Sequence, residues 1–121
     1  MINVIVVRVR QEGDTLIFSQ KEQLINPKES NFKDILQKSL PKGKICAVSL
    51  KSVFPGHAMK ILDEDAGPKQ KRDMQNLPCW TIGDLGFNIY GDAVIYGVEA
   101  SERSSVKISI RDLVPLTTKG L

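Results

Sequence analysis

The strongest constraint on the fold lies in residues 2–10, which are apolar on both sides of an extended chain. The segment is rich in valine and isoleucine, whose branched side chains favour strands. Alternate side chains of a strand point to opposite faces, so Ile5 and Val7 share one face and Val6 lies on the other. A strand with two apolar faces needs a packed layer on each of them. We therefore expect the first half of this segment inside a sheet and not at its edge.

A hairpin is predicted to follow this strand. The turn-forming residues 11–14 separate it from a second strand-like segment that ends at Ser19. A loop made of those four residues would place Val9 opposite Leu16.

One helix is predicted, over residues 31–40. Its apolar residues recur at spacings that share one helical face, and they are Phe32, Ile35, Leu36 and Leu40. The sequence Pro41-Lys42-Gly43 is a typical helix stop.

The remaining strands are expected to be joined by short turns. Residues 44–50 and 58–62 have strand character. Three further strands, 85–90, 93–98 and 106–111, are predicted to form a meander in which Ile89 lies opposite Val94 across a turn at Gly91-Asp92.

Together these elements predict the fold class mainly β (α+β), with an antiparallel rolled sheet or small barrel of six or seven strands and one short helix. Residues 1–116 are expected to form a single compact domain. Residues 63–78 have few large apolar side chains and are predicted to be a long surface loop, and residues 117–121 a short C-terminal tail.

The sequence carries no signal for secretion or for a membrane. The N-terminus has no basic start before an apolar stretch, and no apolar run approaches the roughly 18 residues that a spanning helix needs. The two cysteines form no disulfide framework, so a cytoplasmic location with reduced thiols is the simplest interpretation.

The residues that usually carry catalysis are few. His57 is the one histidine, and nothing around Cys46 or Cys79 resembles a nucleophile motif. These three residues are too few and too widely spaced for a zinc site. Phosphate-binding loops and the familiar hydrolase motif are absent. We therefore expect no metal, no cofactor and no enzymatic activity.

The basic residues favour one alternative function, the binding of single-stranded nucleic acid. The net charge is +3, but residues 35–72 hold eight basic and three acidic side chains. A basic groove with exposed aromatic rings is the chemistry that such binding needs. The candidate contacts are Lys44, Lys51, Lys60, Lys69, Lys71, Arg72, Tyr90, Lys107 and Arg111.

The leading hypothesis is a small non-enzymatic binding module that acts through protein–protein contacts, including self-association as a homodimer. Tyr90 and Ile95 are predicted on the outer face of the meander, where together they would form an apolar interface. A second alternative is a small-molecule pocket in the rolled sheet, lined by Phe54, His57 and Trp80.

Overall fold

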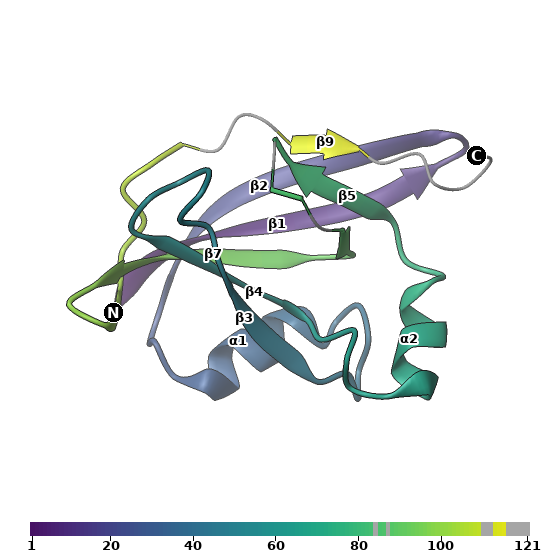
Figure 1. Ribbon diagram of the computed structural model, residues 1–121, viewed down its shortest axis with the longest axis horizontal. Helices are drawn as coiled ribbons and strands as arrows, with labels where there is room; N and C mark the ends of the chain where they lie inside the picture. The colour runs from purple at the N-terminus through teal and green to yellow at the C-terminus, as the bar shows by residue number, and fades with distance from the viewer. Residues whose placement is uncertain (84, 87, 110–112, 116–121) are drawn as a thin grey trace.

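The computed structural model describes residues 1–83, 85–86 and 88–109, and the backbone of 113–115 (Figure 1). The predicted contact Arg111 and the predicted tail 117–121 lie outside the described residues.

The chain is mainly β, as the sequence predicts, with 46% strand and 14% helix. Six strands form one antiparallel sheet, in the order β2-β1-β7-β4-β3, and β8 pairs with the far end of β7. Their bounds are β1 Ile2–Glu12, β2 Thr15–Ile25, β3 Ile45–Ser49, β4 His57–Leu62, β7 Ala93–Glu99 and β8 Glu102–Ser104. Among the described strands the sheet is not closed into a barrel, so β2 and β3 are its edges.

The sheet is covered on both faces (Figure 1). On one face lies helix α1, Glu29–Leu36. On the other lies a small second sheet, made of β6 (Ile89–Tyr90), β5 (Cys79–Ile82) and β9 (Leu113–Pro115) in that order. A second helix, α2 (Pro68–Met74), leads into β5.

The two covers explain why β1 is apolar on both faces. Val4 and Val6 belong to the core cluster that contains Phe32 of α1, whereas Ile5 and Val7 belong to the cluster that contains Trp80 of β5. The prediction that β1 is an inner strand is confirmed, because β1 lies between β2 and β7.

The predicted register of the first hairpin is wrong by two residues. Val9 pairs with Phe18, because the turn contains only Gly13 and Asp14. Gly13 has a φ of +59°, in the left-handed region that glycine adopts at little cost and that tight hairpin turns require. The hairpin is also longer than predicted, since β2 continues to Ile25.

The predicted meander is not formed. Ile89 pairs with Trp80 in the small sheet and not with Val94. Strand β7 instead lies between β1 and β4, where both of its faces are buried. Ile95 and Val94 point to opposite faces of β7 and lie in different core clusters. A central position therefore buries the apolar side chains on both faces of the strand.

Residues 63–78 contain helix α2, which the sequence analysis missed. Gln70 ties this helix to the main sheet, because its amide accepts from the backbone N–H of Lys44 and donates to the carbonyl oxygens of Lys44 and Asp63. Met74 is only 2% exposed and anchors the end of the helix. Helix α1 begins two residues before the predicted helix and ends at Leu36.

Candidate functional site

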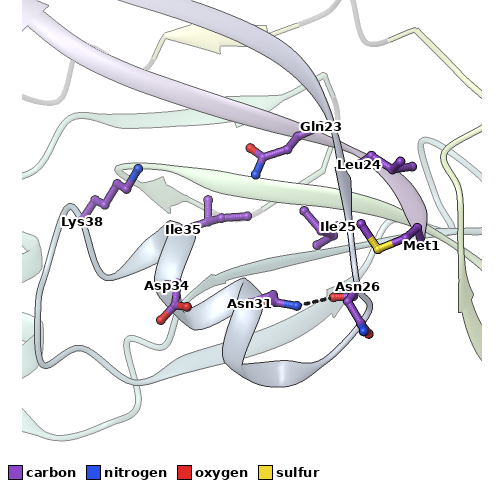
Figure 2. Close-up of a pocket in the computed structure, with 9 residues that line it drawn as sticks. All are labelled: Met1, Gln23, Leu24, Ile25, Asn26, Asn31, Asp34, Ile35 and Lys38. Carbon is purple, nitrogen blue, oxygen red and sulfur yellow. Dashed lines mark hydrogen bonds between the residues drawn. The ribbon is translucent and has the colours of Figure 1, made fainter.

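A groove of about 450 Å³ runs between the last residues of β2 and helix α1 (Figure 2). Strand and helix supply opposite walls. The lining residues are Met1, Gln23, Leu24, Ile25, Asn26, Asn31, Asp34, Ile35 and Lys38.

The helix wall follows from helical periodicity. Asn31, Asp34, Ile35 and Lys38 are spaced by three, four and seven residues, so they share one side of α1 and of the turn that follows it. Asn31 also fixes the entry to the helix, since its side-chain amide donates to the Asn26 carbonyl oxygen at 2.7 Å.

One end of the groove is apolar and open to solvent. Met1 is 73% exposed and Leu24 is 56% exposed, which makes them the two most exposed large apolar side chains among the described residues. Ile25 and Ile35 are buried and form the floor. Exposed apolar side chains beside a concave surface are typical of protein–protein contact sites.

The strand wall is an unpaired sheet edge. In an antiparallel pair, backbone groups of alternate residues point toward the partner strand and away from it. The amide of Val9 donates to Asp92, and the carbonyl oxygen of Asn3 accepts from Val106, so these residues of β1 point away from β2. Their partners, Phe18 and Leu24, therefore point away from β1.

The same alternation assigns the intervening residues of β2. The N–H and C=O groups of Gln20, Glu22 and Leu24 face outward, whereas those of Lys21 and Gln23 bond to β1. Among the described strands β2 pairs with β1 alone. The outward groups can therefore accept a further strand.

The predicted interface of Tyr90 and Ile95 is not present at the surface. Ile95 has no exposed area and lies between β1 and β4, so its predicted exposure is wrong. Tyr90 is partly exposed and belongs to the small sheet. The sequence does not show that residues 89–90 join a second sheet, nor that this sheet covers the face of β7 on which Ile95 lies.

One predicted basic contact is buried instead of exposed. Lys60 is 7% exposed, and its ammonium group contacts the Glu29 carboxylate at 3.1 Å. Arg103 reaches the same carboxylate at 2.6 Å and lies over the ring of Phe32. These groups link β4, β8 and α1, so Lys60 has a structural role.

The carboxyl group of Glu29 makes stability depend on pH. Burial raises its pKa, but the hydrogen bonds and charges of Lys60 and Arg103 outweigh this and hold the pKa below its ordinary value of 4.5. A lowered folded-state pKa adds stability that is complete above pH 4.5 and is lost as the pH falls through the folded value. Because the Glu29 side chain is 43% exposed, we expect at most about 1 kcal/mol.

We predict that Glu29→Gln lowers stability by more at pH 7 than at pH 3, because the contribution of the Glu29 carboxylate falls as the pH drops below 4.5. Urea unfolding at both pH values measures the difference. Glu22→Gln is the control, since Glu22 is exposed and forms no ion pair within the described part of the chain. An equal loss at both pH values would contradict the prediction.

Two of the predicted basic contacts meet in a second cavity, of about 220 Å³. Lys44 and Lys69 line it together with Lys42, and the carboxylate of Asp73 lies 3.8 Å from the Lys69 ammonium group. Lys71 and Arg72 are exposed on α2. The structure thus brings Lys69 of α2 close to Lys42 and Lys44 in the loop before β3.

The other predicted basic contacts do not join this group. Lys51 is exposed in the turn after β3. Lys107 pairs at 3.2 Å with Glu99, the last residue of β7.

The three predicted pocket residues are engaged in packing and hydrogen bonds. Trp80 has no exposed area, and its indole N–H donates to the Gly91 carbonyl oxygen at 2.7 Å. His57 is buried and accepts from the amide of Lys107 through Nε2, so its proton lies on Nδ1, 3.1 Å from the Pro55 carbonyl oxygen. Phe54 packs against the core cluster that contains Trp80.

A third cavity, of about 210 Å³, has an acidic rim near Cys46 and Tyr90. Burial, with the nearby charge of Asp63, raises the pKa of the Cys46 thiol, which therefore stays protonated at neutral pH. Within the described ranges no group of three or more histidine, cysteine, aspartate or glutamate residues could hold a metal ion.

Comparisons with protein-family models, with curated proteins and with solved structures gave no match for this chain. No helix in the described part of the chain is long and apolar enough to cross a membrane.

Sequence reasoning missed the groove beside β2. The polar residues Asn31, Asp34 and Lys38 recur at helical spacing, which indicates a common side of the helix. The sequence does not show that this side faces an open strand, because that depends on which strand forms the edge.

Proposed function

We propose that this chain is a non-enzymatic binding module that takes up an extended segment of a partner protein along the open edge of β2. The observation that carries the proposal is the groove of about 450 Å³ between that edge and α1. Adding a strand to an exposed sheet edge is a common mode of peptide recognition, in which backbone hydrogen bonds give affinity and side-chain pockets give specificity.

A different chain is favoured over a second copy as the partner. Symmetric pairing of two β2 edges about Glu22, the middle one of the three outward residues Gln20, Glu22 and Leu24, would place Glu22 opposite Glu22. Like charges directly opposite one another destabilise a strand pair. The hypothesis of a homodimer thus becomes the less favoured form of the same proposal. A cytoplasmic location stays a prediction from the sequence.

The test removes one outward backbone donor. We predict that Glu22→Pro abolishes the enrichment of 12-residue peptides from a phage-displayed random library, whereas Glu22→Ala retains it. Proline lacks an N–H group but is tolerated on an edge strand where that group faces solvent. The alanine variant removes the same side chain and keeps the donor, so the pair isolates the backbone contribution.

Circular dichroism would verify that the proline variant is folded. A library that yields no binders, or binders that tolerate Glu22→Pro, would contradict the proposal. Lys21→Pro serves as a second control, because its N–H group faces β1 and its loss should weaken the fold itself.

The cavity lined by Lys42, Lys44 and Lys69 favours a second candidate function, the binding of single-stranded nucleic acid. We predict that Lys69→Ala/Lys71→Ala/Arg72→Ala lowers the slope of log affinity against log salt by about two, since each phosphate contact contributes about 0.7. Fluorescence anisotropy with a labelled oligonucleotide at two salt concentrations measures the slope. Absence of binding at low salt, or an unchanged slope, would remove this candidate.

A further inference from the structure

We infer that the segment bound beside β2 is antiparallel to β2 and carries an apolar residue followed, four residues later, by an acidic residue on the side facing α1. This inference rests on the proposed function and specifies the chemistry of the partner.

The direction follows from the sheet. All strand pairs of the main sheet are antiparallel. Antiparallel pairing is slightly more stable per residue than parallel pairing, so an added strand that continues the pattern runs opposite to β2. Its residue opposite Ile25 then precedes its residue opposite Lys21.

The register between β1 and β2 shows which residues of β2 face α1. Ile25 pairs with Ile2, Gln23 with Val4 and Lys21 with Val6. The three partners on β1 belong to the core cluster beneath α1, and residues directly opposite one another point to the same face. Lys21, Gln23 and Ile25 therefore face α1.

These three residues would also lie closest to the side chains of the bound segment. Their backbone groups bond to β1, so they would form the non-hydrogen-bonded pairs with an added strand. In such pairs the Cα atoms are about 4.5 Å apart, against about 5.5 Å in the hydrogen-bonded pairs. Recognition of side chains is therefore expected at these positions.

The position opposite Ile25 favours an apolar side chain. It lies at the end of the groove where Met1 is exposed and where Ile25 and Ile35 form the floor. Covering Met1 would remove apolar surface from water, which stabilises the complex.

The position opposite Lys21 favours an acidic side chain. Neither Lys21 nor Lys38 forms an ion pair with any described residue. In Figure 2 the Lys38 side chain extends toward the strand wall, whereas the Asp34 carboxylate extends toward the opposite side. Unpaired positive charge at this end of the groove complements a carboxylate.

Glu22 gives an independent constraint on the opposite face of the added strand. Its outward backbone groups would form a hydrogen-bonded pair, and its side chain points away from α1. The residue opposite it is expected to be basic. The preferred segment is thus apolar-x-x-basic-acidic in chain order.

Two synthetic peptides test this order. The first is acetyl-Val-Thr-Gln-Lys-Glu-Thr-amide, and the second exchanges its lysine and glutamate. We expect the wild-type chain to bind the first peptide about three- to tenfold more tightly, because the exchange replaces two attractive cross-strand pairs by two repulsive ones. The variant Lys21→Glu/Glu22→Lys should reverse the preference.

Chemical-shift titrations of the ¹⁵N-labelled chain measure both affinities and the location of binding. Changes should be largest at the outward amides of Gln20, Glu22 and Leu24 and absent on α2. Equal affinity for the two peptides, or a preference that the exchange variant leaves unaltered, would overturn the inference.

The library selection separates this inference from the proposed function. Selected peptides that require the β2 edge but lack the apolar and acidic pattern would overturn the inference and leave the function standing. Failure of both designed peptides, together with a library that yields no edge-dependent binder, would overturn both.

Discussion

Trp80→Ala is expected to lower the free energy of unfolding by about 3–5 kcal/mol, the usual cost of truncating a large buried aromatic residue. Trp80 has no exposed area and lies in the cluster between the two sheets, where Phe18 packs edge-on against it at 5.5 Å between ring centroids. The truncation leaves a cavity and also removes the donor to the Gly91 carbonyl oxygen. Urea unfolding followed by fluorescence or circular dichroism measures the loss.

Two control variants separate the contributions to this loss of stability. Trp80→Phe keeps an aromatic ring and loses the indole donor, so it should cost about 1–3 kcal/mol. Leu24→Ala truncates a side chain that is 56% exposed and should change stability by less than about 0.5 kcal/mol. A stability loss for Trp80→Ala no larger than that for Leu24→Ala would show that the small sheet is not packed against the main one.

Asp92→Ala is expected to lower the free energy of unfolding by about 2–4 kcal/mol. Asp92 is 5% exposed, and its carboxylate accepts hydrogen bonds from the Arg8 guanidinium at 2.8 Å, the Ser39 hydroxyl at 2.6 Å and the Val9 amide at 3.0 Å. Removing one partner of a buried pair costs about 3–5 kcal/mol. We expect somewhat less because Arg8 is 32% exposed and can be rehydrated.

A double-mutant cycle with Arg8→Ala tests whether the pair acts as a unit. The double variant should lose clearly less stability than the two single losses combined, since groups in one network are not additive. Additive losses would contradict the proposed coupling. The exposed ion pair of Arg10 and Glu12 is the matched control, and Glu12→Ala should change stability little.

The same network positions the candidate site. Arg8 also donates to the carbonyl oxygen of Ile35, on the wall of the groove, at 2.8 Å. Through this contact β1 and the turn before β7 hold the end of α1 beside β2. Asp92→Ala is therefore expected to weaken binding in the groove even under conditions where the variant remains folded.

The sequence determined the features that depend on periodicity along a single segment. Valine and isoleucine on both faces of residues 2–10 predicted an inner strand, because each face must be removed from water. The spacing of Phe32, Ile35 and Leu36 predicted the buried side of α1, since these residues recur at the helical period. These local patterns were sufficient for the mainly β class.

Tertiary structure decided the features that depend on which segments become neighbours. Ile95 and Lys60 are buried because β7 is central and α1 brings Glu29 over β4, and neither fact is encoded near those residues. Likewise, β6 pairs with β5 in the small sheet, where Ile89 and its partner Trp80 are both buried.

The candidate site belongs to this second group. Its helix wall is visible in the sequence as a helical repeat, but its other wall is the edge of β2. Whether a strand is an edge depends on the order of all strands in the sheet, and that order results from the packing of two covering layers on one sheet. A groove between an edge strand and a helix is thus a property of the assembled fold, because its two walls become neighbours only when the core beneath them has formed.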